Sequence, residues 1–317
     1  MLLEHLAMGI YVEIPIHASM DELWEKTQNP QLHQRWDLRF TQIEYLPRED
    51  EEPHRFLYRT RIGFGLKIDG QGESIGERDG EDGARTSSLK FWSEDPKSLI
   101  KTGSGYWKYV PDGKKPWPGE DARHPTIRFF TWYDYEARFG TLGKLIDRFL
   151  FRPLLGWATA WSFDRLRLWI EKGITPEASR DRAIAYALAR GMMAFIWFYH
   201  GLVPKLLYQD RIELDLLSRI TPPDFLRTAA TFAGVLELCF AFLLILLWRQ
   251  TWPLWVTVVL MLAGIPIVAL TAPEYLHAAF NPVTLNISLA VFAGIALVVR
   301  RDLATAASCL RKPKENS

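Results

Sequence analysis

The sequence predicts an α+β domain at the N-terminus, followed by an all-α bundle of four membrane-spanning helices. Three observations lead to this fold class. Charged and aromatic residues are frequent up to about Gly173. In the same half, apolar and polar residues alternate with the period of two that half-buried strands require. Beyond Ile184 the chain contains four long apolar runs with few charges, each with about the 20 residues that a helix needs to cross a bilayer.

Whole-chain composition hides this division and excludes several classes of function. The chain has 317 residues, of which 24% are charged, and a formal net charge of +1. A nucleic-acid-binding protein is not expected, because it would need a basic surface. Cys239 lies in an apolar run and Cys309 in a basic tail, so we expect neither a disulfide framework nor a cysteine-rich metal site. The histidines of the first half lack metal-ligand spacing, and no metal is expected.

The first half has the pattern of a strand, two short helices, six further strands and a long helix. Residues 10–16 alternate in polarity, which is typical of a half-buried strand. Ser19 and Glu22 form a capping box that predicts the start of the first helix. The closing helix is expected at about residues 142–172, with an interruption at Pro153. The further strands are expected at residues 40–46, 55–62, 66–75, 85–92, 98–110 and 127–136.

This element order resembles the START-like fold of the SRPBCC superfamily, which includes polyketide cyclases and lipid-transport proteins. The resemblance covers residues 9–173 and includes the motifs Ile10-Tyr11-Val12-Glu13-Ile14-Pro15-Ile16, Leu23-Trp24 and Trp36-Asp37. It implies a helix-grip domain, in which a curved sheet wraps around the last helix and a cavity between them holds an apolar ligand. For each aromatic candidate the alternative is a place in a filled core. The candidates for lining the cavity are Tyr58, Trp92, Tyr106, Trp132, Trp157 and Trp161.

The second half contains apolar segments of helical length at residues 184–207, 228–248, 252–271 and 279–299. Buried helices of a soluble bundle would show a polar stripe at helical spacing. Glu237 is the one charged residue between positions 235 and 248, and none lies between positions 255 and 270. Hydropathy therefore predicts four spanning helices.

The distribution of basic residues predicts that both termini lie in the cytoplasm. The opposite side would have fewer basic residues, diluted by four acidic ones. The first nine residues lack the pattern of a signal peptide, which agrees with this orientation. The basic residues on the cytoplasmic side would be Arg180, Arg182, Arg249, Arg300, Arg301, Arg311, Lys312 and Lys314.

These features define the expected domains and location of the chain. The START-like domain is expected at residues 1–173, a linker at 174–182, the transmembrane domain at 183–301 and a basic cytoplasmic tail at 302–317. We expect a multi-pass protein of the cell (inner) membrane whose short linker keeps the α+β domain near the bilayer. Arginines of the closing helix could then face anionic headgroups, namely Arg148, Arg152, Arg165 and Arg167.

Polar residues inside the predicted spans indicate a site within the bundle. A charge at the bilayer centre costs about 2.5–3.5 kcal/mol on insertion scales. At a rise of about 1.5 Å per residue, His200, Glu237 and Asn286 reach a similar depth, in the half of the bilayer away from the cytoplasm. The alternative is that each is a hydrogen-bonding residue that holds the helices together. The candidates are His200, Lys205, Glu237, Asn281 and Asn286.

Three segments of the second half resemble the DoxX-like family of membrane proteins. They are Trp197-Phe198-Tyr199-His200-Gly201-Leu202-Val203-Pro204-Lys205-Leu206-Leu207, Gly234-Val235-Leu236-Glu237 and Asn281-Pro282-Val283-Thr284-Leu285-Asn286. The resemblance covers about residues 182–301 and implies a four-helix integral membrane protein. Some members are subunits of membrane redox complexes that pass electrons to quinone, which makes quinone a candidate cofactor and redox proteins candidate partners.

Three functions remain open on the sequence alone. In the first, the α+β domain binds or transfers a lipid-like or isoprenoid small molecule at the membrane. In the second, the bundle is a component of a quinone-linked redox system and the α+β domain is accessory. In the third, the protein is a non-catalytic assembly partner. The chain contains no phosphate-loop motif, and the sequence assigns no catalytic residue.

Overall fold

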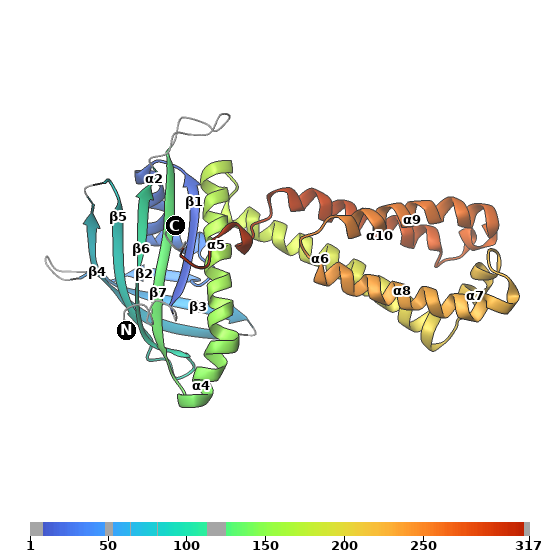
Figure 1. Cartoon of the computed structure of the whole chain (residues 1–317), viewed down its shortest axis with the longest axis horizontal. Coiled ribbons are helices and arrows are strands. Elements are labelled where there is room, and N and C mark those ends of the chain that lie inside the picture. The colour runs from blue at the N-terminus through green and yellow to red at the C-terminus, as the bar shows by residue number, and fades with distance from the viewer. Residues whose placement is uncertain (1–8, 48–52, 64, 81, 113–124, 314–317) are drawn as a thin grey trace. The chain divides into compact units, whose positions relative to one another are not determined.

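The computed structural model describes residues 9–47, 53–63, 65–80, 82–112 and 125–313. The chain divides into two compact units, shown with their elements in Figure 1. Residues 1–179 and 304–317 form the first, which we call the α+β domain. Residues 180–303 form the second, which we call the helical unit.

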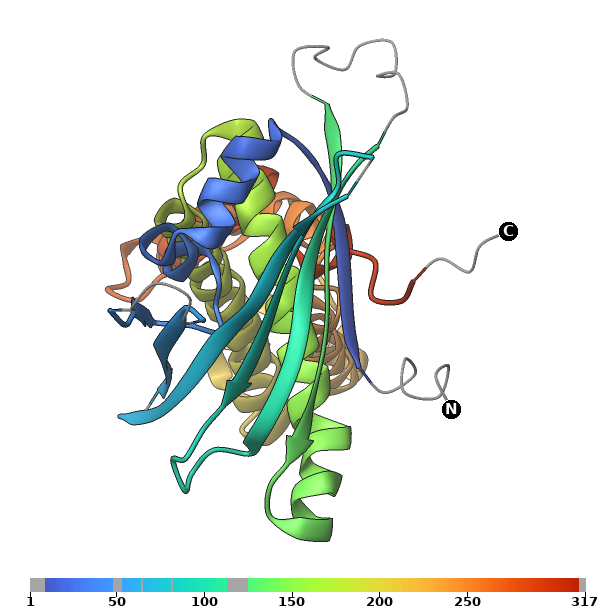
Figure 2. The ribbon, with the colours of Figure 1, turned by 90° about the vertical axis from the view of Figure 1, so that its left-hand side faces the viewer.

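A seven-stranded antiparallel sheet forms the body of the α+β domain. Two helices, α2 (Met20–Gln28) and α3 (Pro30–Trp36), follow the first strand. The last strand is followed by α4 (Gly140–Ile146), the π-helical segment η1 (Asp147–Phe151) and the long α5 (Arg152–Lys172). Figure 2 shows α5 lying against one face of the sheet, which is the helix-grip arrangement. The strand order is β1 (Ile10–His17), β7 (Thr126–Ala137), β6 (Ile100–Pro111), β5 (Arg85–Trp92), β4 (Leu66–Asp79), β3 (Arg55–Gly63) and β2 (Gln42–Tyr45).

The predicted fold class is confirmed, and the local rules that led to it apply. The backbone N–H of Glu22 donates to Ser19 Oγ at 3.2 Å, as expected at the start of α2. The predicted strand at residues 85–92 coincides with β5. Pro153 does not interrupt the closing helix, because it lies in the first turn of α5, where the missing N–H is not needed. The irregular segment is instead η1, directly before it.

The core of the α+β domain lies between the sheet and α5. Ile10, Val12, Ile14 and Ile16 of β1 are all buried, as their alternation predicts. Phe129 of β7 stacks on Phe163 of α5, with 4.5 Å between ring centroids. Large aromatic side chains fill this space at less than one tenth exposure, namely Trp36, Trp107, Tyr109, Phe129 and Phe163.

The predicted C-terminal tail packs on the α+β domain over its described residues, 304–313. Leu310 and Glu13 exchange two backbone hydrogen bonds of 2.9 Å along the edge of β1. The indole N–H of Trp161 donates to the carbonyl of Ala304 at 3.0 Å. This segment satisfies backbone groups that an edge strand otherwise leaves unpaired. Residues 304–313 of the basic tail predicted at 302–317 thus belong to the α+β domain.

The predicted linker at residues 174–182 is also mostly helical. Only three residues separate the end of α5 at Lys172 from the start of helix α6 (Pro176–His200). The side chain of Arg165 on α5 donates to the carbonyl of Pro176 at 2.8 Å, which fixes the start of α6 on the α+β domain. Helix α6 has 25 residues and continues through the expected domain boundary without a break. Composition alone could therefore not place that boundary.

The helical unit contains the rest of α6, the π-helical segment η2 (Gly201–Leu207) and α7 (Arg211–Ser218), followed by three longer helices. These are α8 (Leu226–Leu246), α9 (Trp252–Thr271) and α10 (Pro282–Val299). Among the described residues, three stretches are long and apolar enough to cross a membrane: Pro223–Leu246, Trp252–Thr271 and Pro282–Ser308. The fourth predicted span is helical as α6 and η2, but it includes Arg190 and His200 and is not one of the three.

Arg190 of α6 caps the C-terminal end of α8. Its side chain is fully buried. The guanidinium donates to the carbonyls of Leu244, Leu247 and Gln250 at 2.5, 2.6 and 3.1 Å. It also donates to the Tyr186 hydroxyl at 2.6 Å. The last carbonyls of a helix lack intrahelical partners and attract cations, so this arginine joins α6 to α8.

We predict that Arg190→Leu lowers the thermal unfolding temperature of the full-length protein in detergent. Each carbonyl left without a partner should cost about 1–3 kcal/mol. The matched control is Arg180→Leu, because Arg180 lies on the same helix, is exposed and pairs with its neighbour Asp181. Equal unfolding temperatures for the two variants would contradict the capping role.

Candidate functional site

Four charged or titratable side chains meet where η2, α7 and α8 come together. Lys205 Nζ lies 3.2 Å from Glu237 Oε2 and 3.1 Å from Glu213 Oε2. His200 Nδ1 lies 3.9 Å from Glu213 Oε1. The side chain of Lys205 is only 13% exposed and that of Glu237 only 20%. We call His200, Lys205, Glu213 and Glu237 the polar cluster.

A contact between two glycines brings η2 against α8. A Cβ on Gly201 would lie 2.7 Å from the carbonyl oxygen of Gly234, and a Cβ on Gly234 would lie 2.8 Å from that of Gly201. Neither position could hold a larger side chain without moving a backbone, and small residues at such contacts let membrane helices approach closely. A Cβ on Gly234 would also lie 3.0 Å from Lys205 Cβ, so the Lys205 stem passes over this glycine. Its ammonium then reaches Glu237, three residues further along the same face of α8.

The π-helical geometry of η2 turns Lys205 towards α8. At the end of η2, the N–H of the following residue, Tyr208, donates to the carbonyl of Val203, five residues before it, at 3.1 Å. Pro204 lies inside this segment and supplies no N–H. Short π-helical segments are frequent at functional sites, because the extra residue per turn redirects the side chains that follow.

Helix α7, which lies outside the apolar stretches, contributes Glu213 to the cluster. Asp210 starts this helix, since its carboxylate accepts the N–H of Ile212 at 2.9 Å. Burial raises the pKa of Glu213, but the hydrogen bond with His200 and the charge of Lys205 lower that pKa by more. Glu213 is therefore held ionised at neutral pH, and the cluster combines hydrogen-bond donors with acceptors.

The structure brings together three of the five residues predicted for the intramembrane site, namely His200, Lys205 and Glu237. Asn281 instead caps α10, and its Oδ1 accepts the N–H of Thr284 at 3.0 Å. Asn286 lies against α9, where its Nδ2 would be 2.9 Å from a Cβ on Gly264. Within the described part of the chain, no hydrogen bond or ion pair joins either asparagine to the polar cluster.

Sequence reasoning missed Glu213 and Arg190. Glu213 follows the predicted first span, where an acidic residue is usually part of an exposed loop. Only the turn of the chain after η2 brings Glu213 next to Lys205. Arg190 could have been found, because it is a charged residue inside the apolar run at residues 184–207. Its contacts with helix-end carbonyls show that its role is structural.

The six aromatic residues predicted to line a cavity in the α+β domain do not gather around one. Tyr106 and Trp132 stack on each other, with centroids 6.2 Å apart, on the side of the sheet away from the core. They alternate with buried residues such as Trp107 and Tyr133, which face α5. Sheet alternation therefore removes these two from any cavity under the helix.

The other four predicted residues lie in three different places. Trp157 and Trp161 stack on α5, with centroids 6.3 Å apart, and Trp161 is partly covered by the C-terminal segment. Tyr58 of β3 packs edge-on against Phe40 at 5.5 Å. The Tyr58 hydroxyl donates to the carbonyl of Trp92, the last residue of β5, at 3.4 Å.

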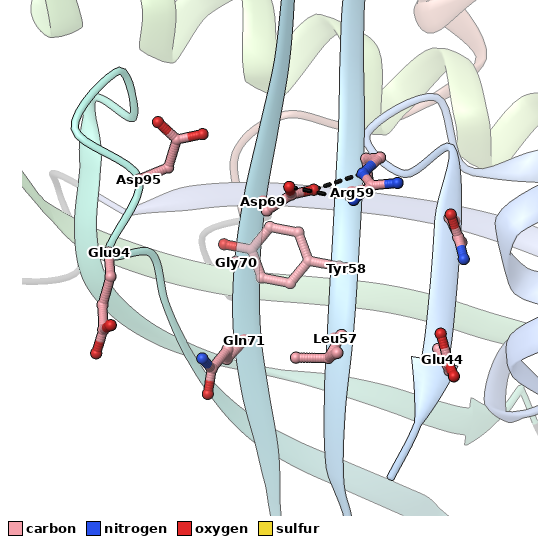
Figure 3. A pocket seen from close by; sticks show the side chains of 10 residues that line it. Glu44, Leu57, Tyr58, Arg59, Asp69, Gly70, Gln71, Glu94 and Asp95 are labelled. Atoms are coloured by element: carbon pink, nitrogen blue, oxygen red, sulfur yellow. Dashed lines mark hydrogen bonds and ion pairs between the residues drawn. The ribbon is translucent and has the colours of Figure 1, made fainter.

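A pocket of about 460 Å³ lies at the β2–β4 end of the sheet (Figure 3). Arg59 and Asp69 pair across it, with 2.6 Å between Nε and Oδ1. Tyr58 is the one predicted residue that lines it. The remaining lining is mostly polar or acidic, unlike the apolar cavity that the START-like resemblance implies: Gln42, Glu44, Leu57, Gly70, Gln71, Glu94 and Asp95.

The Trp36-Asp37 motif has a structural role in the α+β domain. Trp36 is fully buried, and its indole N–H donates to the carbonyl of Lys26 at 2.8 Å. The Asp37 carboxylate lies 2.6 Å from Arg39 Nη2 and 3.0 Å from His33 Nε2. Burial raises the pKa of Asp37, but the Arg39 guanidinium and His33 lower that pKa well below its usual range. The carboxylate is thus satisfied within the domain.

We predict that Gly201→Leu disrupts the polar cluster, because its side chain would force η2 away from the α8 backbone. The full-length variant should unfold at a lower temperature in detergent. Gly191→Leu is the control, since a Cβ on Gly191 of α6 meets no atom within 4 Å. Equal stability of the two variants would show that the glycine contact does not hold η2 in place.

Comparison with known proteins identifies a family model and a sequence relative for this chain. A family model described as the DoxX-like family matches residues 194–294, a range that includes all four residues of the polar cluster. The membrane protein YndG of Bacillus subtilis (strain 168) is 48% identical over 192 residues, which make up 61% of this chain and 68% of YndG.

Three crystal structures are similar to roughly half of the chain. TTHA0849 from Thermus thermophilus has 17% identity and a TM-score of 0.33, covering 46% of this chain and 86% of its own. A conserved protein from Geobacillus kaustophilus has 13% identity and a TM-score of 0.36, covering 52% of this chain and 97% of its own. Ara h 8.0201 has 9% identity and a TM-score of 0.30, covering 49% of this chain and 97% of its own.

At TM-scores this low the three structures carry no argument about function, and the strand order of the sheet itself defines the N-terminal fold. The sequence relative is more informative. With 48% identity over 68% of YndG, the chain belongs to the same family of membrane proteins as YndG, and its residues 194–294 form a DoxX-like domain.

Proposed function

We propose that the helical unit binds the headgroup of an amphipathic, membrane-dissolved small molecule at the polar cluster, and that an isoprenoid quinone is the class of ligand it takes. The observation that carries the proposal is Lys205, held between the carboxylates of Glu213 and Glu237 against the apolar helix α8. Charged groups are costly in this setting and are retained chiefly where they act on a ligand, ion or proton.

The side chains of the cluster match both forms of such a headgroup. Lys205 and His200 can donate hydrogen bonds to the carbonyl oxygens of a quinone. Glu213 and Glu237 can accept hydrogen bonds from the hydroxyls of the reduced form. The exposed apolar side chains of α8 near the cluster, Phe232, Val235 and Leu236, offer a surface for the isoprenoid tail.

Helical rise gives the depth of the cluster in the bilayer. His200 lies 18 residues after Arg182 on α6, which is about 27 Å at about 1.5 Å per residue. Arg182 pairs with Asp302 at the other end of the helical unit, at 3.4 Å. Because hydrocarbon is about 30 Å thick, these two ends lie near opposite interfaces of a bilayer. Glu237 lies 11 residues after Leu226, where α8 begins, which is about 16 Å, so the cluster lies within the hydrocarbon, in the half of the bilayer away from Arg182.

Contacts at the two ends of the helical unit support α6 as the fourth spanning helix. At one end, Arg182 of α6 pairs with Asp302, and Arg300 donates to the carbonyl of Arg249 between α8 and α9. At the other, Arg219 after α7 pairs with Glu274 between α9 and α10, at 2.8 Å. Since α6 runs from the first end to the second, it crosses the membrane if α8, α9 and α10 do. Four crossings place both chain ends on one side, which basic residues assign to the cytoplasm.

The first function expected from the sequence, with the ligand inside the α+β domain, has less support. The described core under α5 is filled by aromatic side chains, and the pocket at β2–β4 is polar and open on the sheet. A lipid-like or isoprenoid ligand remains part of our proposal, but we assign it to the helical unit.

The topology predicts opposite labelling of the two ends by a membrane-impermeant maleimide. In a Cys239→Ala background, Ile220→Cys and Phe280→Cys should react in intact cells, because both positions are exposed in the loops near Arg219 and Glu274. Lys172→Cys should react only in inside-out vesicles. Reaction of all three positions from the same side would exclude four crossings.

The binding site predicts that Lys205→Met weakens binding of decylubiquinone or a short-chain menaquinone by about 10- to 100-fold. The reason is that hydrogen bonds to charged groups contribute about 1.5–3 kcal/mol. The full-length protein in nanodiscs would be titrated and followed by tryptophan fluorescence. Lys205→Arg should retain part of the affinity, since it keeps a charged donor.

The matched control for this titration is Arg219→Gln. Arg219 forms an exposed ion-paired group with Asp215 and Glu274 at the same end of the helical unit, outside the polar cluster. Unchanged affinity in Arg219→Gln together with the loss in Lys205→Met would support the site. Equal affinities in both variants, or no quinone binding by the wild-type protein, would exclude it.

A further inference from the structure

Helices α4 and α5, with η1 between them, expose a continuous apolar stripe on the α+β domain. Figures 1 and 2 show α4 extending beyond the end of the sheet. Its residues follow the spacing i, i+3, i+4, i+7 that places side chains on one helical face. Exposed fractions along the stripe are 67% for Leu142, 50% for Leu145, 44% for Ile146, 73% for Phe149, 57% for Leu150 and 54% for Leu154.

The exposed charges of this segment are positive. Lys144 and Arg148 are exposed beside the stripe. Asp147 is the one acidic residue between positions 138 and 158. Its carboxylate is buried and lies 2.9 Å from Arg152 Nε, so it does not offset the exposed lysine and arginine. The surface therefore combines apolar side chains with a basic flank.

The structure also changes which arginines can face lipid headgroups. Three of the four expected from the sequence are engaged within the α+β domain. Arg152 and Arg167 form ion pairs, and Arg165 donates to backbone carbonyls. Arg148 lies over the ring of Phe149 in the stripe, with its charge exposed. Of the four, Arg148 is thus the one placed beside an apolar surface that could enter a bilayer.

We propose that the stripe on α4, η1 and the start of α5 is a docking surface for an anionic bilayer. A large exposed apolar patch marks an interaction site. A helix with one apolar face and a basic flank lies in the plane of a membrane interface, where anionic lipids attract the flank. Three residues separate α5 from α6, which leads into the helical unit, so a bilayer is always within reach of this domain.

The docking has a structural consequence for α5. Helix α4 and Lys172 lie at opposite ends of α5, which has 21 residues and is about 31 Å long. Contact of the stripe with the same bilayer that α6 enters holds α5 along the membrane surface. The α+β domain is then attached to the membrane at two points, one covalent and one through lipid contact.

The test uses the full-length Cys239→Ala protein with an NBD probe at Phe149→Cys, in nanodiscs that contain nitroxide-labelled lipid. The remaining cysteine, Cys309, is buried. The Cys239→Ala protein without an added cysteine, treated with the same probe, gives the background signal. The discs contain phosphatidylcholine alone or with phosphatidylglycerol. Lys90→Cys is the matched control, because Lys90 is exposed on the side of β5 away from the core. We expect blue-shifted emission and quenching at position 149, greater with phosphatidylglycerol, and neither effect at position 90.

A second variant tests the basic flank separately from the apolar stripe. Lys144→Gln with Arg148→Gln should reduce quenching at position 149 in phosphatidylglycerol discs to the level in phosphatidylcholine discs. Both substitutions are at exposed positions and leave the core intact. Equal, water-like emission at positions 149 and 90 in all discs would overturn the proposal. So would a blue shift at position 149 without lipid quenching but with energy transfer between two labelled copies, which would assign the stripe to a protein interface.

Discussion

The position of Lys205 between two carboxylates is the interaction on which the rest of the helical unit depends. An ammonium group in apolar surroundings is costly unless oppositely charged groups lie next to it. Glu237 on α8 and Glu213 on α7 provide these groups, at 3.2 and 3.1 Å. To bring them together the chain must leave α6 through a π-helical segment, turn back through α7 and pack η2 directly on the α8 backbone. The contact between Gly201 and Gly234 makes this packing possible.

The charged groups of the helical unit serve two distinct purposes. Arg190 is completely enclosed by carbonyl groups and the Tyr186 hydroxyl, so its donors are used in joining α6 to α8. The polar cluster at the other end of α6 has side chains that are partly exposed and contains both donors and acceptors. That difference in exposure is why we assign ligand binding to the cluster and a structural role to the arginine. Exposure also distinguishes two features of the α+β domain. The buried Asp37 carboxylate has a structural role, and the exposed apolar stripe is a surface for interaction.

Much of the architecture follows from local sequence patterns, and the exceptions have identifiable causes. Strand alternation and the capping box at Ser19 predicted β1 and α2, because these rules depend on near neighbours alone. His200 and Glu237 were predicted to lie at similar depths, since helical rise converts sequence position into depth. Glu213 could not be predicted, because its approach depends on the turn after η2. Asn281 was predicted as part of the site, and the structure places it at the start of α10, where an asparagine before a proline is common.

The aromatic residues of the α+β domain show a further limit of sequence reasoning. Tyr106 and Trp132 are aromatic residues of the kind that line ligand cavities. Neighbouring residues of a strand point to opposite faces of the sheet, however, and these two lie on the face away from the core. The resemblance predicted the fold correctly without placing these side chains. Likewise the boundary between the units could not be seen, because α6 continues through it without a break.

A double-mutant cycle between Lys205 and Glu237 tests the central claim most directly. Unfolding free energies of the full-length protein in detergent would be measured for Lys205→Met, Glu237→Gln and the double variant. If the ion pair holds η2 on α8, the two substitutions should be coupled by about 0.5–3 kcal/mol. Additivity within about 0.5 kcal/mol would show that the two side chains do not interact and would contradict the account.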